Sequence, residues 1–433
     1  MKSRFFKYVI QNMLGMFGMS LYILADTFFI SKAVGTNGIT ALNLVLPVYN
    51  LIFAIGSMIG VGSAIRFTVE KNTNRERADS YFFHALLWAG IISMIFIIAG
   101  LFYPHKIIGL LGGDNEIIET GKNYTRIFMT FTPLFMWNHI CNAFVRNDNN
   151  PSIAMAATLI SSIFNIVFDY ILMFPLNMSM SGAALATALS PLVGILICLI
   201  HFKSAKNTIK IKPVFPSVKK LYYSISVGVS AFVAELSSGV ITVAFNMIIL
   251  GIAGNTGVAA YGVVANISLV AVAFFNGVTQ GSQPLVSEYY GKGQNKNVNR
   301  LFKMALITSF TVSALVIGII FLGTKQIVAI FNSENDIELA KYAWKGLRLY
   351  AIGFLFASLN IVGTGLLSAI EAVSLAFVAS VMRGFVVIIG AAFIMAYLFG
   401  MTGVWMAYPA AEAITLVVTM LGIKATLKKM NKY

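Results

Sequence analysis

Two short stretches show how the chain is organised: Gly35-Thr-Asn-Gly-Ile-Thr-Ala41 and Gly254-Asn-Thr-Gly-Val-Ala-Ala260. They match at an offset of 219 residues, and each opens an apolar run of helical length. A nearly constant offset along the chain indicates an internal repeat of about 220 residues. Further matches follow at offsets of 219 to 221: Gly62 with Gly281, Ser63 with Ser282, 114–117 with 334–337, and Gly182 with Gly403.

The composition excludes a soluble protein. Of 433 residues, 58% are hydrophobic and 11% are charged, whereas a soluble domain carries about 25% charged residues. So small a charged fraction cannot cover a soluble surface, and it also excludes a disordered or fibrous chain. The composition therefore predicts a polytopic membrane protein with the lipid bilayer as its solvent. We expect that membrane to be the cell (inner or plasma) membrane.

Apolar runs separated by glycine, proline and charge predict twelve transmembrane helices. We expect an all-α integral membrane fold with two six-helix lobes. Six is an even number, so both halves insert in the same orientation as a parallel repeat. The predicted N-terminal lobe is 1–202, the basic linker 203–220 and the C-terminal lobe 221–433. The predicted helices span 8–31, 39–66, 81–103, 122–145, 153–176, 182–202, 221–250, 258–287, 301–322, 342–370, 374–399 and 403–424.

The positive charges predict the topology. The termini and the loops on one side carry 22 of the 31 basic residues, and the 5–6, 7–8 and 11–12 loops carry none. The positive-inside rule then places both termini in the cytoplasm. The net charge of +15 thus reflects cytoplasmic loops rather than a surface for nucleic acid. Cys141 and Cys198 lie inside apolar runs, where we expect small buried side chains rather than a disulfide or a metal pair.

Three polar residues lie where the bilayer should exclude them. Asp26 lies in helix 1, and Asn165 and Asp169 form an i,i+4 pair on one face of helix 5. Counting the helical rise puts both carboxyls at similar depth, in the outer half of the first repeat. Intramembrane carboxyls are costly and usually functional. Two such groups could share a proton or ligate a cation; the alternative is a structural role, in which each is capped by neighbouring hydroxyls.

The second half carries its own buried charges. Glu235 in helix 7 could bind a proton or a cationic solute, or it could be a protonated structural residue. Asn266 in helix 8 falls at a comparable depth and could face it. Arg383 in helix 11 and Glu412 in helix 12 fall near the midplane, and we expect them to form a structural ion pair rather than a coupling site.

No motif for nucleotide hydrolysis or for hydrolytic catalysis occurs in the sequence. It contains no P-loop, so ATP hydrolysis within this chain is excluded as an energy source, and no zinc-protease or nucleophile-elbow motif. We therefore expect a protein that is not an enzyme and has no cofactor.

These features together resemble the multidrug and toxic compound extrusion (MATE) family over essentially the whole chain. The resemblance is carried by Ala25-Asp26-Thr27, Asn165-Ile-Val-Phe-Asp169, Gly182-Ala-Ala-Leu-Ala-Thr187, and Gly281-Ser-Gln-Pro284 followed by Tyr290-Gly291. Family members with an acid in helix 7 match at Glu235, but the acid that some carry in helix 10 is missing, and Asn360 is the only amide there. The resemblance implies two lobes and an exchange of drugs for protons or sodium ions, with Thr187 beside the cation site.

We therefore expect a monomeric antiporter that moves small amphipathic or cationic compounds outward by alternating access. A proton or Na⁺ is expected at Asp26, Asn165, Asp169 and Thr187. The nearest rival is a flippase for lipid-linked oligosaccharides with the same two lobes, but it should have a cationic cavity for phosphate. A channel would need a continuous hydrophilic pore, and a membrane enzyme would need a nucleophile or a metal cluster.

Overall fold

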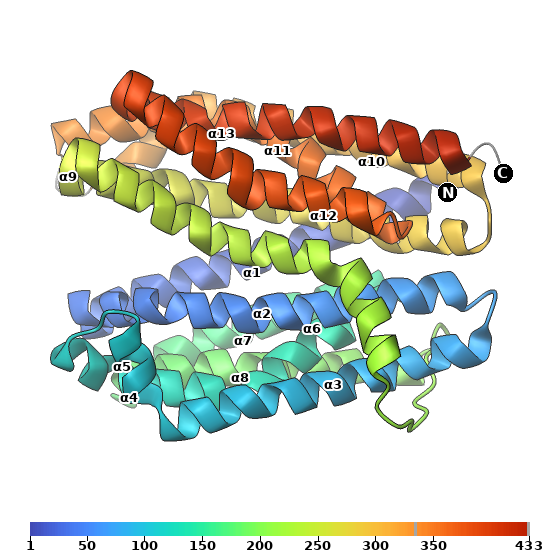
Figure 1. The fold of residues 1–433 in the computed structure, drawn as a ribbon. Coiled ribbons are helices and arrows are strands. Elements are labelled where there is room, and N and C mark those ends of the chain that lie inside the picture. Colours follow the sequence, from blue (N-terminus) through green and yellow to red (C-terminus); the bar gives the residue numbers. More distant parts are fainter. Residues whose placement is uncertain (333–335, 431–433) are drawn as a thin grey trace. The chain divides into compact units, whose positions relative to one another are not determined.

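The computed structural model describes residues 1–332 and 336–430, and every regular element in that range is a helix (Figure 1). The first part of the chain forms α1 (Lys2–Val34), α2 (Thr36–Glu70), α3 (Arg75–Phe102), α4 (Pro104–Leu110), α5 (Asn115–Thr130), α6 (Thr132–Asn147), α7 (Pro151–Met173), α8 (Ser179–Leu199) and η1 (Ile200–Lys203). The second part forms α9 (Val218–Gly291), α10 (Asn295–Phe331), α11 (Ile337–Ala369), α12 (Val373–Val381), the π-turn η2 (Met382–Val386) and α13 (Val387–Met430).

The predicted all-α fold with twelve spans is confirmed. Within the described residues, nine helical segments are long and apolar enough to cross a membrane. Two of them, 218–291 and 373–430, each contain two of the predicted spans. The remaining predicted span, 122–145, is divided between α5 and α6. Pro133 opens α6 there, and proline cannot donate the hydrogen bond that would continue α5.

Glycines with positive φ make three of the turns between spans. Gly35 has φ 75° between α1 and α2, and Gly254 has φ 60° where α9 reverses direction. Gly400, with φ 56°, divides α13 in the same way. Glycine adopts this conformation without a steric cost. The two stretches that reveal the repeat are therefore the same tight turn, made once in each half.

The chain divides into two compact units. The first unit comprises 6–236, and the second comprises 237–433 together with the first five residues. The division falls inside the first arm of α9, so residues 218–236 of this helix belong to the first unit. Within the second unit, Arg4 reaches Glu288 near the end of α9, with 2.7 Å between Nη2 and Oε2.

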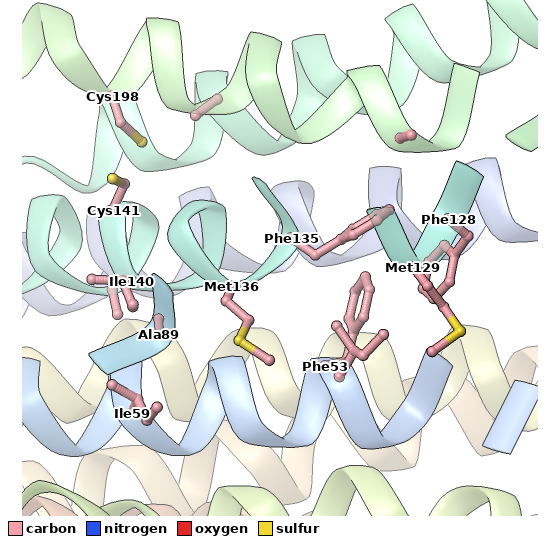
Figure 2. Packing of buried hydrophobic residues seen from close by; sticks show 14 of the residues in the cluster. Phe53, Ile59, Ala89, Phe128, Met129, Phe135, Met136, Ile140, Cys141 and Cys198 are labelled. Carbon is pink, nitrogen blue, oxygen red and sulfur yellow. The ribbon is translucent and has the colours of Figure 1, made fainter. Parts of the chain in front are cut away.

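Aromatic side chains pack together with aliphatic ones in the core of the first unit (Figure 2). Phe53 of α2, Phe128 of α5 and Phe135 of α6 lie with ring centroids 4.7 to 5.6 Å apart along this cluster, and Tyr49 stacks on Phe53 at 4.2 Å. Such pairs add to the stability that burial alone supplies. Cys141 and Cys198 are buried and free, which confirms the prediction of small buried side chains.

The core of the second unit is arranged around α11. Tyr350 of α11 stacks on Tyr408 of α13 with centroids 4.1 Å apart and an interplanar angle of 3°. Trp405, also on α13, is completely buried.

Candidate ion-coupling site

The first unit buries the four residues that the sequence singled out as a coupling site. Asp26 lies on α1, Asn165 and Asp169 lie on α7, and Thr187 lies on α8. All four are buried, and Asn165 and Asp169 have no exposed surface at all. Three different helices therefore supply the polar groups, and each helix is apolar on either side of them.

Close packing of α1 against α7 sets the position of Asp26. A Cβ on Gly15 or Gly18 would meet Thr158 or Leu159 of α7, so these glycines let the two helices approach. Further along α1, Phe29 contacts Phe174 at the end of α7, with centroids 6.0 Å apart. Asp26 lies between these two contacts along α1, close enough for its charge to interact with that of Asp169.

Asn165 joins the carboxyl to the hydroxyl. With its nitrogen toward Asp169, the amide donates to Oδ2 of that residue at 3.1 Å, and its oxygen accepts from the backbone nitrogen of Thr187 at 3.3 Å. This orientation is the one that satisfies both neighbours. The hydroxyl of Thr187 also lies 3.3 Å from the amide. The i,i+4 spacing in α7 thus places the amide and the carboxyl on one face, as predicted from the sequence.

Each of the two carboxyls keeps one oxygen without a partner. Among the residues that the structure describes, nothing forms a hydrogen bond with Oδ1 of Asp26 or Oδ1 of Asp169. A buried carboxylate is costly unless it is neutralised by a proton or a cation. Carboxylate and hydroxyl oxygens are hard ligands of the kind that a sodium ion binds, whereas the Asn165 amide oxygen already accepts from Thr187. The unpartnered carboxylate oxygens are therefore suited to either a proton or a sodium ion.

Tyrosines surround the carboxyls, and the sequence did not single them out. The hydroxyls of Tyr22 on α1 and Tyr49 on α2 lie 3.2 Å apart. Tyr22, Tyr49 and Tyr124 all lie within electrostatic reach of Asp26. In the sequence, Tyr22 could have been linked to the site only by its i,i+4 spacing from Asp26, which places it one helical turn before that residue.

Glu235 and Asn266 both lie on α9, but on different arms of it. Glu235 is half-buried on the first arm, within the first unit. Asn266 lies beyond Gly254 and belongs to the second unit. The expectation that they face each other stays a prediction.

Arg383 and Glu412 are in direct contact in the second unit. Nη2 of Arg383 lies 2.7 Å from Oε1 of Glu412, and Asn360 donates to the other carboxylate oxygen at 2.7 Å. The helix of Asn360, α11, has no buried carboxylate of its own at this position. The carboxylate that Asn360 contacts comes instead from Glu412 on α13. The sequence suggested the ion pair but not this third member.

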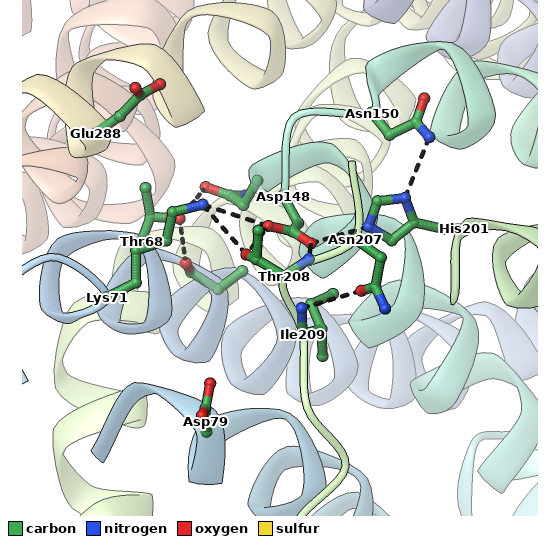
Figure 3. Close-up of polar contacts among 12 residues, drawn as sticks. Thr68, Lys71, Asp79, Asp148, Asn150, His201, Asn207, Thr208, Ile209 and Glu288 are labelled. Carbon is green, nitrogen blue, oxygen red and sulfur yellow. Dashed lines mark hydrogen bonds and ion pairs between the residues drawn. The ribbon is translucent and has the colours of Figure 1, made fainter. Parts of the chain in front are cut away.

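A second polar cluster, centred on Asp148, lies beyond the ends of the first unit's helices (Figure 3). Asp148 accepts from Nε2 of His201 at 3.0 Å, from the backbone nitrogen of Thr208 at 2.5 Å and from Lys71 at 3.3 Å. Asn150 donates to the other ring nitrogen of His201 at 3.1 Å, which fits the tautomer protonated at Nε2. These contacts fasten the start of the 203–220 segment to α2, η1 and the turn between α6 and α7.

The Asp148 carboxylate should make stability depend on pH. Burial alone raises the pKa of Asp148, but the hydrogen bonds from His201 and Thr208 and the charge of Lys71 together bring the pKa below its ordinary value. A lowered pKa stabilises the fold above the pKa of an unfolded aspartate, about 3.9, and this contribution is lost as pH falls through the folded pKa. We expect Asp148→Ala to lower the free energy of unfolding by about 3 kcal/mol at neutral pH.

Unfolding of the purified protein, followed against pH, checks this expectation. The variant should also lose part of the acid-induced drop in stability that the wild type shows. Glu119→Ala is the matched control, because the Glu119–Lys122 pair is exposed and such pairs contribute about 0.5 kcal/mol or less. Equal stability of Asp148→Ala and wild type at neutral pH would contradict the role given to the cluster.

The fold and the buried carboxyls define a polytopic membrane protein with two related six-helix halves. The family model MatE matches residues 12–171 and 230–394, so the chain belongs to the MatE family.

Curated relatives are similar over nearly the whole chain. One is the multidrug export protein MepA of Staphylococcus saprophyticus, 28% identical, with 97% of this chain and 94% of that protein covered. MepA of Staphylococcus aureus (strain MRSA252) is also 28% identical, over 94% of this chain and 90% of that protein.

Solved structures share the fold. An outward-facing multidrug resistance MATE family transporter of the MOP superfamily superimposes with a TM-score of 0.93 at 22% identity, covering 99% of this chain and 96% of that one. A MOP superfamily transporter from Pyrococcus furiosus, reported with a binding pocket of reversed polarity, gives a TM-score of 0.92 at 22% identity, over 100% and 97% of the two chains.

Proposed function

We propose that the protein is a secondary active multidrug efflux antiporter, which exports small amphipathic or cationic compounds in exchange for H⁺ or Na⁺. The observation that carries the proposal is the pair of buried carboxyls, Asp26 and Asp169, each with an oxygen that lacks a partner among the described residues. Such a pair needs a proton or a cation to neutralise it, and a counter-ion of this kind is the one that an antiporter would exchange. The relatives named as multidrug export proteins support the choice of substrate.

The exchange would act through the charge on α1 and α7. With the carboxyls ionised, their repulsion favours a wider site. A proton or Na⁺ that reaches Asp26, Asn165, Asp169 and Thr187 removes that repulsion, so α1 and α7 close together and the drug is expelled. Removing one charge from a low-dielectric site shifts a two-state equilibrium by a few kcal/mol, which changes the populations substantially. Release of the ion on the other side resets the cycle.

The remaining assignments complete the proposal. Glu235 would contact cationic substrates, with Asn266 as a second polar contact. The basic loops would face the cytoplasm together with both termini. The lobes would be 1–202 and 221–433, joined by the linker 203–220, in a monomer of the cell membrane.

Dye transport in proteoliposomes tests the proposal. Vesicles that contain the purified protein and ethidium are given a proton gradient, and in a separate experiment a sodium gradient, directed against dye movement. We expect one of the two gradients to accelerate dye efflux well above that of protein-free vesicles. Efflux that responds to neither gradient would contradict antiport, even if dye crosses the membrane.

A further inference from the structure

The carboxylate of Glu412 is fully satisfied by groups of the protein itself. Its Oε1 accepts from Nη2 of Arg383 at 2.7 Å, and its Oε2 accepts from Asn360 at 2.7 Å. Asn360 also donates to the backbone oxygen of Glu412 at 2.8 Å. Glu412 and Asn360 are almost completely buried, and the side chain of Arg383 is 15% exposed. This is therefore a buried ion pair held by three helical segments, η2, α11 and α13.

The internal repeat relates this triad to the candidate coupling site. Gly182 matches Gly403, and the same offset of 221 places Thr187 opposite Tyr408, one turn before Glu412. The fifth and sixth spans of the first half carry Asp169 and Thr187, and those of the second half carry Arg383 and Glu412. Corresponding helix pairs thus each hold a buried carboxylate, although the amide bonded to Glu412 comes from α11, outside its pair.

The two sites differ in what neutralises the carboxylate. In the described part of the first unit, Oδ1 of Asp26 and Oδ1 of Asp169 have no hydrogen-bond partner. In the second unit, a guanidinium that cannot lose its proton in a protein lies against Glu412. Arg383 lies on a π-turn, a rare departure from α geometry that is often found at functional sites.

We propose that Arg383 acts as a tethered cation. In the second unit its guanidinium neutralises the buried carboxylate, as the exchangeable ion does in the first unit. Glu412 then binds no mobile proton or Na⁺, and ion exchange is confined to the carboxyls of the first unit. The inference rests on the proposed function, because it assigns the exchanging site to one half only. It gives Arg383 the role of a positioning residue that holds the second-unit carboxylate permanently neutralised.

In the described part of the second unit, three phenols lie close to Arg383 and Glu412. Tyr408 lies on the same helix, Tyr350 stacks on it from α11, and Tyr261 approaches from α9 beside Trp405. Phenols are uncharged at neutral pH, so among these described neighbours Arg383 supplies the charge that neutralises Glu412.

The double variant Arg383→Met with Glu412→Gln provides the main test. It removes both charges together and keeps an acceptor for Asn360. Replacing a buried ion pair by neutral groups of similar volume is commonly tolerated. We expect the purified variant to bind as many protons, measured by potentiometric titration, or as many ²²Na⁺ ions as the wild type does, and to retain coupled dye efflux. A loss of one bound ion would overturn the inference, because Glu412 would then have been exchanging an ion.

The single variant Arg383→Met gives the opposite expectation. With its guanidinium removed, Glu412 should take up a cation from solution, so the count of bound ions rises by one, and Glu412→Gln in the same chain should remove the extra ion. An unchanged count in a folded single variant would overturn the inference. A purely structural pair would alter stability but not the number of bound ions.

Failure of the proposed function would look different. In that case Asp26→Asn and Asp169→Asn would leave both ion binding and coupled efflux unchanged, whatever the variants of Arg383 and Glu412 show.

Discussion

Asp26→Asn and Asp169→Asn are each expected to abolish ion-coupled dye efflux while leaving the protein inserted in the membrane. Asparagine preserves the size of each side chain but cannot release a proton or carry the charge that a sodium ion needs. Without a change of charge, ion binding no longer shifts the balance between the two states. We expect the gradient-dependent rate in proteoliposomes to fall by more than about tenfold, since a loss of even 1.4 kcal/mol of coupling corresponds to that factor.

The matched control for these variants is Glu119→Gln. Glu119 is exposed and forms an i,i+3 pair with Lys122, so its loss should leave efflux unchanged. Thr187→Ala should have a smaller effect than either aspartate variant, because the hydroxyl contributes a ligand but no charge. Normal gradient-dependent efflux in both aspartate variants would exclude these carboxyls as the coupling site.

The coarse fold could be predicted from the sequence because lipid imposes simple rules. Apolar runs of spanning length and basic loops are local features of the sequence. The internal repeat can be recognised from matching turn sequences, such as those at Gly35 and Gly254. The division of the 122–145 span into α5 and α6 was not predicted, although Pro133 was a visible signal. The position of the break between the two helices depends on how α5 and α6 pack, and the hydrophobic periodicity of the sequence contains no information on that packing.

The coupling site could be predicted only in part. Counting the helical rise placed Asp26 and Asp169 at similar depth, and the i,i+4 rule paired Asn165 with Asp169. The contacts between helices were beyond such counting. Tyr49 reaches Tyr22 from α2, and Asn360 meets Glu412 across 52 residues of chain. The carboxylate that α11 lacks beside Asn360 is supplied by Glu412 of α13. A sequence pattern within one helix cannot reveal such a contact.

The Asp148 cluster was missed for a related reason. Asp148 and Thr208 lie in connecting segments, where polar residues are expected and carry little information, and His201 lies alone at the end of the predicted 182–202 span. Only the folded chain shows that all three converge and that Asp148 has no exposed surface.

Two glycines mark the closest approach of α2 to the first arm of α9, within the first unit. A Cβ added to Gly62 would collide with the backbone oxygen of Ser224, and a Cβ added to Gly228 would collide with the backbone oxygen of Met58. The two clashes are reciprocal, so the helices cross backbone to backbone at this point. Such crossings of small residues bring membrane helices together by close van der Waals contact.

Gly62→Ala and Gly228→Ala are therefore each expected to impair transport strongly. The added methyl group meets backbone rather than a movable side chain, so the helices must separate and lose contact along the crossing. Overpacking of this kind costs about 1–3 kcal/mol, and we expect a lower melting temperature together with dye efflux reduced about tenfold. Gly262→Ala on α9 and Gly318→Ala on α10 are the matched controls, because an added Cβ meets no described atom within 4 Å there. Wild-type melting and efflux in both crossing variants would show that α2 and α9 do not need this contact.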